Sequence, residues 1–242
     1  MKKTKITIVM PVWRRAEILK IVLKQLSKFI DFNKDLFEFR TVFVLSNEDP
    51  EHFELFRNIM YFKKYDLTIV NYSNDFVSDK TNAGFHEAMK EDFDYIMNIG
   101  SDDLIHEFLL TLYKPYFKIK KPFFGINSLY ITDFESKKTV FYKSYNSPFA
   151  VGAGRMISRE VMNKVYAKYS KLYPEGLQRV LDANSAKRIH KLNYGCAVLD
   201  SGQFPYIVDL KSDININDFE KFDKYKGSTD IEKNIVLNTY EL

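Results

Sequence analysis

The chain has 242 residues, of which 45% are hydrophobic and 28% are charged, a balance typical of a folded globular protein. Its 21 Phe and 16 Tyr residues exclude a fully disordered chain, the low counts of Gly (9) and Pro (7) exclude collagen-like sequences, and a single Cys excludes an internal disulfide framework. The net charge is +4: residues 212–242 hold seven acids and four lysines (−3), which leaves +7 on residues 1–211 and favours an anionic ligand such as a nucleotide, a phospholipid headgroup or DNA.

The N-terminal segment lacks the features of a signal peptide. The apolar run Ile6–Val12 follows three lysines, but Pro11 interrupts this run, and Arg14 and Arg15 follow it closely. No later segment reaches the ~20 apolar residues that cross a membrane. We therefore expect a cytoplasmic protein, with peripheral binding to the inner face of a membrane as an open alternative.

The first hundred residues alternate between strand-like and helix-like patterns. We expect strands at residues 6–10, 39–45, 67–72 and 95–99, of which the first and the last are short, mostly apolar runs. We expect helices at residues 16–29, 51–64 and 80–89, and the first of them has apolar residues at helical spacing. This alternation predicts an α/β protein with a parallel sheet and helical crossovers.

The second half has a different pattern. After a helix expected at residues 104–116, segments 123–130 and 139–142 are predicted to form an antiparallel hairpin. Two further helices are expected at residues 158–169, with Ser158 as the N-cap, and at residues 183–191. Residues 212–242 lack apolar periodicity and are expected to form a loosely packed acidic tail with a short terminal element.

Two adjacent carboxylates, Asp102 and Asp103, follow the apolar strand expected at residues 95–99. Open α/β sheets bind ligands at the carboxyl ends of their strands, and neighbouring side chains diverge, so one carboxylate can face a metal and the other a sugar hydroxyl. Carboxylates shared with phosphates suit Mg²⁺ or Mn²⁺. The alternative is that Asp102 is the N-cap of the helix expected from Leu104.

Three segments follow one another in the first half: VMPVWRR (Val9–Arg15), KTNAGFHEAM (Lys80–Met89) and YIMNIGSDD (Tyr95–Asp103). Their order and spacing resemble the nucleotide-binding half of GT-A fold glycosyltransferases of family 2, over roughly residues 5–110. The resemblance implies a Rossmann-like, mostly parallel sheet flanked by helices, with a smaller antiparallel element in the second half. It also implies a single catalytic domain at residues 1–211, with a donor half at 1–110 and an acceptor half at 111–211.

The resemblance further implies a donor site at the ends of the strands. The residues implied in donor binding are Pro11, Val12, Trp13, Arg14, Asn47, Lys80, Asn82, Gly84, Ser101 and Asp102. The implied metal ligands are Asp102 and Asp103, with His190 as a further candidate because some relatives use a late His. Two positions depart from the family pattern: Gly100 stands where the first Asp of an Asp-x-Asp motif is usual, and the turn at residues 46–49 leaves the base-contacting residue open.

The implied reaction is an in-line displacement at the anomeric carbon of a nucleotide-sugar, in which a carboxylate takes the proton of the acceptor hydroxyl. Asp182 resembles the acidic residue at the start of a late helix in relatives and is the first candidate for this base; Glu175 is the second. Asp182 could instead be an N-cap. Gly152, Gly154 and Arg155 resemble the family's acceptor loop, although a plain turn would use glycine as readily.

The sequence therefore predicts a Mn²⁺- or Mg²⁺-dependent inverting glycosyltransferase with a UDP-linked donor and a glycan or lipid-linked glycan as acceptor. Two alternatives stay open. One is sugar transfer to hydroxylated DNA bases, as in phage-encoded transferases, and the other is a catalytically silent nucleotide-sugar-binding module, suggested by Gly100. A nucleotidyltransferase is disfavoured because the segment after the first strand has no glycine-rich loop.

Overall fold

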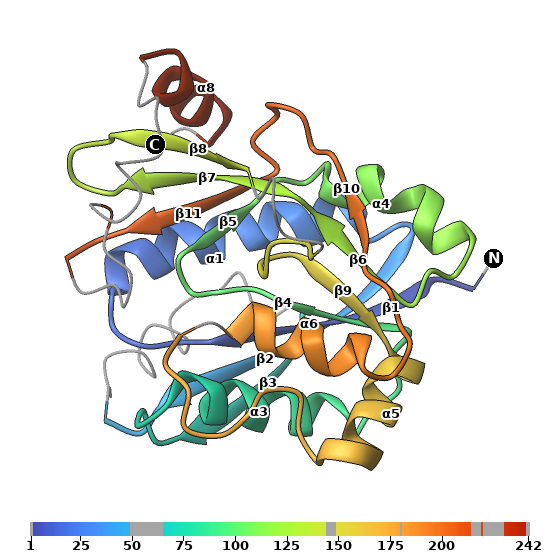
Figure 1. The fold of residues 1–242 in the computed structure, drawn as a ribbon. Helices are drawn as coiled ribbons and strands as arrows, with labels where there is room; N and C mark the ends of the chain where they lie inside the picture. The colour runs from blue at the N-terminus through green and yellow to red at the C-terminus, as the bar shows by residue number, and fades with distance from the viewer. Residues whose placement is uncertain are drawn as a thin grey trace.

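The computed structural model describes residues 2–48, 65–143, 149–179, 181–213, 219 and 230–240. The helix expected at residues 51–64 lies outside the described residues. Within them, a seven-stranded sheet with the strand order β10-β6-β9-β4-β1-β2-β3 forms the centre of the molecule (Figure 1). Its strands are β1 (Thr4–Pro11), β2 (Phe37–Ser46), β3 (Asp66–Tyr72), β4 (Tyr95–Asn98), β6 (Phe123–Ile126), β9 (Arg155–Ser158) and β10 (Ala197–Leu199).

The large sheet is mostly parallel, as the sequence predicts. Strands β4, β1, β2 and β3 are parallel neighbours, whereas β9 runs antiparallel to both β4 and β6. The short apolar strand β1 is buried on both faces, because Ile8 contributes to one hydrophobic core and Val9 to the other. This double burial is why residues 8–10 are all apolar, and the polar Thr7 that precedes them is itself buried.

A second, four-stranded sheet has the order β5-β11-β7-β8. Its strands are β5 (Asp103–Ile105), β7 (Ser128–Asp133), β8 (Thr139–Lys143) and β11 (Ile207–Lys211). The pairing of β7 with β8 confirms the expected hairpin. Strand β11 pairs antiparallel with β5 and parallel with β7, so this small sheet joins residues 103–105 to strands from the second half of the chain.

Two expected elements were wrong in their bounds. Residues 103–105 form β5 rather than the start of a helix, and α4 (Leu109–Lys118) begins later. The apolar run expected as one strand at residues 123–130 is split at residue 127, with β6 in the large sheet and β7 in the small one. In both cases the partner strand that decides the structure lies far away in sequence.

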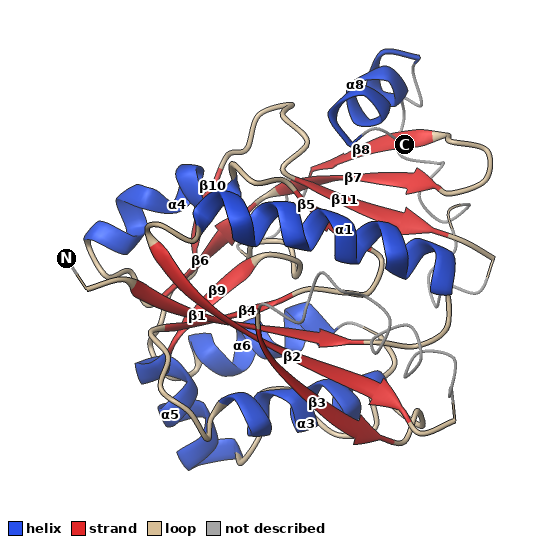
Figure 2. Cartoon of the chain, turned by 180° about the vertical axis from the view of Figure 1, so that it is seen from behind, coloured by secondary structure: helices blue, strands red, loops and turns tan. Residues whose placement is uncertain are grey.

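Helices cover both faces of the large sheet. Helices α1 (Ala16–Asn33) and α4 contribute to the core shared with the small sheet, and α1 lies between the two sheets (Figure 2). The other face carries α3 (Val77–Ala88), α5 (Arg159–Tyr169) and α6 (Leu181–His190). The predicted N-cap of α5 is confirmed, because Ser158 Oγ accepts a hydrogen bond from the Val161 amide.

The C-terminal helix α8 (Asp230–Tyr240) lies beside β8 (Figure 1). Its Val236 and Tyr240 are buried in the main core, and the Tyr240 hydroxyl donates a hydrogen bond of 2.6 Å to the Pro205 carbonyl. The expectation of a loosely packed tail therefore does not describe this helix. The prediction of loose packing rested on weak apolar periodicity over residues 212–242, whereas Ile235, Val236 and Tyr240 pack this helix against the main core.

Candidate active site

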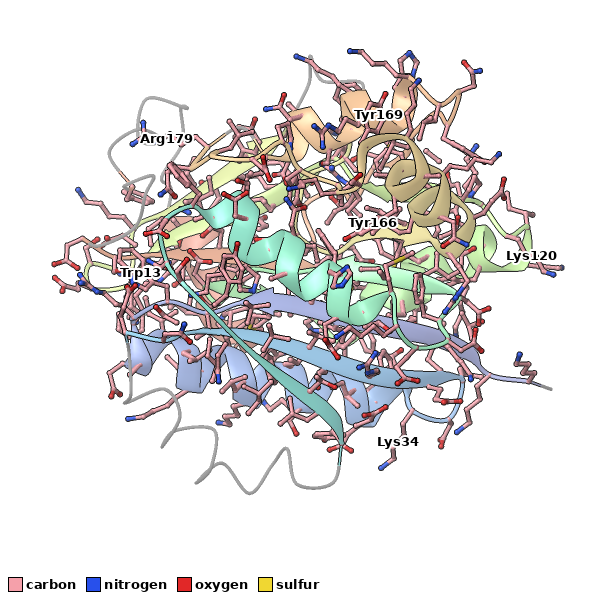
Figure 3. All side chains as sticks on the ribbon, turned by 90° about the horizontal axis from the view of Figure 1, so that it is seen from below. Trp13, Lys34, Lys120, Tyr166, Tyr169 and Arg179 are labelled. Atoms are coloured by element: carbon pink, nitrogen blue, oxygen red, sulfur yellow. The ribbon has the colours of Figure 1, made fainter. Side chains whose placement is uncertain are left out.

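A cleft of about 450 Å³ opens at the carboxyl ends of β1 and β4, where α/β sheets bind ligands. Its walls come from both sheets, from the loop at residues 149–153 and from the first turn of α6. Trp13, which follows β1, marks this edge of the molecule, and Lys120 lies at the opposite edge (Figure 3). The predicted site residues that line this cleft are Pro11, Asp102, Asp103, Gly152, Arg155 and Asp182.

Three carboxylates converge on one side of the cleft. Asp102 and Asp103 follow β4, and Asp209 on β11 stands opposite Asp103 in the antiparallel register of β5 and β11. One oxygen of each carboxylate lies within 4.8 Å of the others. The adjacent pair expected from the sequence is thus the larger part of a three-carboxylate cluster, to which β11 contributes Asp209.

Gly100 explains how two consecutive carboxylates can turn to the same place. A Cβ at this position would lie 2.5 Å from Asp102 Oδ1 and 2.8 Å from Asp103 Oδ2. The Gly100 amide also donates a hydrogen bond to Asp103 Oδ2. The missing first Asp of the usual motif therefore leaves room for the carboxylates that follow it.

Two cationic side chains are built into the carboxylate cluster. Arg15 donates to Asp102 Oδ2 at 2.6 Å and to Ser101 Oγ at 3.0 Å, from a left-handed backbone conformation (φ 60°) at the start of α1. The Lys211 ammonium lies 2.6 Å from Asp209 Oδ2. Burial alone would raise the pKa of Asp102, but the charges of Arg15 and Lys211 and the hydrogen bond from Arg15 outweigh burial and lower it.

The pKa values of Asp103 and Asp209 are raised, whereas that of Asp102 is lowered. Burial, followed by the charges of Asp102 and Asp209, raises the pKa of Asp103 well above its usual value. Burial also raises the pKa of Asp209, although Lys211 opposes this effect. In addition, Asp209 Oδ1 is buried and has no hydrogen-bond partner among the described residues. An orphaned carboxylate oxygen beside two further carboxylates fits a divalent cation that prefers oxygen ligands.

The helix-capping interpretation of Asp102 is wrong. No helix begins at Leu104, which lies in β5, and the first residue of α4 is Leu109. The Asp102 side chain is instead bound by Arg15, and its carbonyl accepts a hydrogen bond of 2.8 Å from the Leu210 amide. Backbone and side chain together fasten Asp102 between α1 and β11.

Asp182 lies on the other side of the same cleft, exposed in the first turn of α6. Its carboxylate covers Gly152 so closely that a Cβ at Gly152 would overlap it. Since α6 begins at Leu181, Asp182 is inside the helix, which excludes its alternative role as the N-cap. An exposed carboxylate at the mouth of a cleft is accessible to an acceptor hydroxyl.

Arg155 connects the Gly152 loop to α6. This buried guanidinium donates to the carbonyls of Ala150, Val151 and Asp182. A further hydrogen bond of 3.2 Å reaches Ser185 Oγ. These contacts support a positioning role, although Arg155 also lines the cleft. Gly154, with φ +70° and little space beside Ile207, allows the tight turn that precedes β9.

Hydrogen bonds with β2 and α3 fix the turn after β1. The Val12 amide donates to the Val44 carbonyl at 2.9 Å, and the buried Lys80 ammonium donates to the Val12 carbonyl and to Asn74 Oδ1. Arg14 is exposed, and its guanidinium lies 4.7 Å from the centre of the Trp13 ring. Lys80 thus supports the turn that carries the predicted donor-binding residues Val12 and Trp13.

Asn82 and Gly84 fix the position of α3. Asn82 makes two hydrogen bonds of 3.0 Å with the backbone of Tyr173, one to its carbonyl and one from its amide. Gly84 faces the large sheet, with Val9 and Val44 at the position of an absent side chain. These contacts place both residues in packing roles, and direct donor contacts stay predictions.

Gly84→Ala is expected to lower the free energy of unfolding by about 1–3 kcal/mol, because overpacking a close-packed core is destabilising. The added methyl group would lie 2.6 Å from Val9 Cγ1 and 2.7 Å from Val44 Cγ2. Urea denaturation followed by circular dichroism measures the change. Gly195→Ala is the matched control, because a Cβ at Gly195 meets no described atom within 4 Å. Unchanged stability with weaker UDP binding would favour a direct donor contact by Gly84.

Several predicted residues do not line this cleft, among them Glu175, His190 and Asn47. Glu175 is exposed, forms an ion pair with Lys171 and lines a different cavity, between α3 and α5. His190 is exposed at the last residue of α6, eight residues (about 12 Å of helix) beyond Asp182. Asn47 is exposed after β2, where its amide donates to the Tyr72 carbonyl. Nothing in these positions brings Glu175 or His190 to the three carboxylates.

Sequence reasoning missed Arg15, Asp209 and Lys211 as site residues. A signal for the last two was present, because IVDLK (Ile207–Lys211) places an acid and a base two residues apart in an otherwise apolar run. Two charges on one face of a buried strand must be paired or must bind a ligand.

None of the described helices is both long and apolar enough to span a membrane. No family model and no curated protein sequence matches the chain. Solved structures do match its fold. The S. aureus TarS 1–349 structure in complex with UDP-GlcNAc superposes with a TM-score of 0.63 at 16% identity, over 98% of this chain and 67% of that one.

Two further TarS structures give the same result. The complex of S. aureus TarS 1–349 with UDP has a TM-score of 0.60 at 16% identity, over 98% of this chain and 66% of that one. Another structure of S. aureus TarS has a TM-score of 0.60 at 16% identity, over 98% of this chain but 40% of that one. This chain thus spans about two thirds or less of the length of these TarS chains. The likeness confirms that the chain has the GT-A fold.

Proposed function

We propose that the chain is a glycosyltransferase that moves a sugar from a nucleotide-sugar, with UDP as the nucleotide, to a hydroxyl acceptor. The observation that carries the proposal is the placement of the Asp102–Asp103–Asp209 carboxylates and the exposed Asp182 carboxylate around one cleft at the strand ends. The fold supports it, because TarS structures of the same fold hold UDP-GlcNAc and UDP.

Asp102, Asp103 and Asp209 would hold a divalent cation, Mn²⁺ or Mg²⁺. When bound, such a cation supplies Lewis-acid stabilisation of the leaving diphosphate. The protein's own part is to keep the carboxylates together: Gly100 gives them room, Arg15 orients Asp102, and the pairing of β5 with β11 fixes Asp209 opposite Asp103.

Asp182 would accept the proton of the acceptor hydroxyl as it attacks the anomeric carbon from the face opposite the leaving diphosphate, which inverts the configuration. Arg155 and Gly152 support this role, because they hold the first turn of α6 against the loop at residues 149–153. Tyr173 lies in the cleft wall, and burial and the charge of Asp182 raise the pKa of its hydroxyl, which keeps that hydroxyl protonated beside the base.

The acceptor side of the cleft favours a glycan. Its wall includes the apolar side chains of Leu129 and Ile131 on β7 and the aromatic side chains of Tyr142 and Phe149. Aromatic rings pack well against the apolar faces of sugar rings and offer no positive charge to a phosphate backbone. This wall supports a glycan or lipid-linked glycan acceptor over hydroxylated DNA.

A thermal-shift panel of nucleotide-sugars, with Mn²⁺ and with EDTA, tests the proposal. A UDP-sugar in Mn²⁺ is expected to raise the melting temperature, because a ligand at 100 times its Kd stabilises the native state by about 2.7 kcal/mol. UDP release from that donor then separates an enzyme from a silent binding module. Stabilisation by none of the nucleotide-sugars would refute the proposed function, and stabilisation without UDP release, with acceptor glycans present, would favour the module.

A further inference from the structure

Lys211 is a buried cation inside the candidate donor site. It ends β11, is 6% exposed and lines the cleft together with the three carboxylates. Its ammonium lies 2.6 Å from Asp209 Oδ2, and the two residues are two apart in a strand, so they share one face. Fully buried lysines are rare in proteins unless they are paired.

The charge of Lys211 is maintained by the carboxylate cluster. Its ammonium is buried against Asp209 Oδ2, and Asp209 stands opposite Asp103 in the paired strands, so the positive charge of Lys211 lies among carboxylates. Arg15 forms a similar ion pair with Asp102, in which a guanidinium nitrogen lies 2.6 Å from Asp102 Oδ2. Two of the three carboxylates that would hold a divalent cation are therefore already paired with cations of the protein.

A cation in this position has opposite effects on two ligands. It repels a divalent cation that must take the same carboxylates, and it attracts the anionic diphosphate of a donor placed beside that cation. In the low-dielectric cleft both effects are stronger than they would be at an exposed lysine.

Resting on the proposed function, we infer that Lys211 is a built-in cation of the donor site, which competes with the divalent cation for Asp209 and attracts the diphosphate of the donor. The donor and the divalent cation would then bind in a coupled manner. Lys211 would keep the carboxylates from repelling one another before either ligand arrives.

The test uses Lys211→Met in the full chain, with Mn²⁺ alone and UDP alone as probes. The variant is expected to bind Mn²⁺ at least about tenfold more tightly than the wild type, because a repelling charge is gone. In EDTA it is expected to bind UDP at least about tenfold more weakly, because an attracting charge is gone. Isothermal titration calorimetry measures both affinities, and circular dichroism and thermal melting verify the fold.

Lys143→Met is the matched control, because Lys143 pairs with Asp200 at 2.9 Å and Asp200 is largely exposed outside the cleft. It is expected to leave both affinities unchanged. If Lys211→Met does not fold, Lys211→Gln replaces it, since a polar amide can still hydrogen-bond Asp209. A folded variant with unchanged or weaker Mn²⁺ binding would overturn the inference and leave Lys211 as a structural ion pair. By contrast, a wild-type chain that binds neither probe would refute the proposed function itself.

Discussion

Asp182→Asn is expected to cut sugar transfer by about 10²–10⁴-fold, the range ascribed to general-base catalysis, and to leave donor affinity nearly unchanged. The amide keeps the shape of the side chain over Gly152 but cannot accept the proton of the acceptor hydroxyl. Because the three-carboxylate cluster lies on the other side of the cleft, the substitution is expected to leave the affinities for the donor and for its cation unchanged. Transfer rates and the Kd of UDP, measured on the same preparation, separate the two effects.

Glu175→Gln is the matched control for this experiment. Glu175 is an exposed acid of the same segment, but it pairs with Lys171 and lines a different cavity. The control is therefore expected to transfer sugar at the wild-type rate. Loss of UDP binding in Asp182→Asn would point to a metal-binding or structural role for Asp182, and near-normal transfer would show that the base is another group.

The elements predicted correctly from the sequence share one property: their pattern is local. Helix α1 displays its apolar residues at helical spacing over 18 residues, and β1 gathers the apolar residues Ile6, Ile8, Val9 and Met10, so each can be identified without its neighbours. Strands β5 and β11 have three and five residues, and each is stabilised by the other from about a hundred residues away. A local pattern cannot contain that information, and β5 was therefore taken as part of a helix.

The residues of the candidate site fall into the same two groups: some have a local sequence pattern, and others are placed by a strand pairing that is distant in sequence. Asp102 and Asp103 were found because they are adjacent and follow a recognisable strand. Asp209 and Lys211 were missed because only the pairing of β11 with β5 brings them to that point. Asn82 and Lys80 illustrate a different limit. The segment KTNAGFHEAM predicts that both residues bind the donor. In the structure, Asn82 donates a hydrogen bond to the Tyr173 carbonyl and Lys80 donates one to the Val12 carbonyl, so both residues hold the walls of the cleft in place.

Asp103→Asn is expected to abolish the Mn²⁺-dependent part of UDP binding. Asp103 is next to Asp102 in sequence and opposite Asp209 across the strand pair. The substitution therefore removes the central carboxylate of the three that would hold the cation. Asparagine preserves the size of the side chain and can still accept the hydrogen bond from the Gly100 amide. Calorimetric titration of UDP in Mn²⁺ and in EDTA measures the change: the wild type is expected to show a large difference in Kd, and the variant none.

Stability distinguishes a ligand role from a structural one in this variant. Burial and the charges of Asp102 and Asp209 disfavour the ionised form of Asp103, which is why its pKa is raised. Replacing it by a neutral amide removes that unfavourable interaction, so the free energy of unfolding is expected to stay the same or to increase. Asp200→Asn, at an exposed ion pair, is the control and should leave UDP binding unchanged. A drop of about 1 kcal/mol in stability, with Mn²⁺-dependent UDP binding intact, would instead show that Asp103 acts through its hydrogen bond to the Gly100 turn.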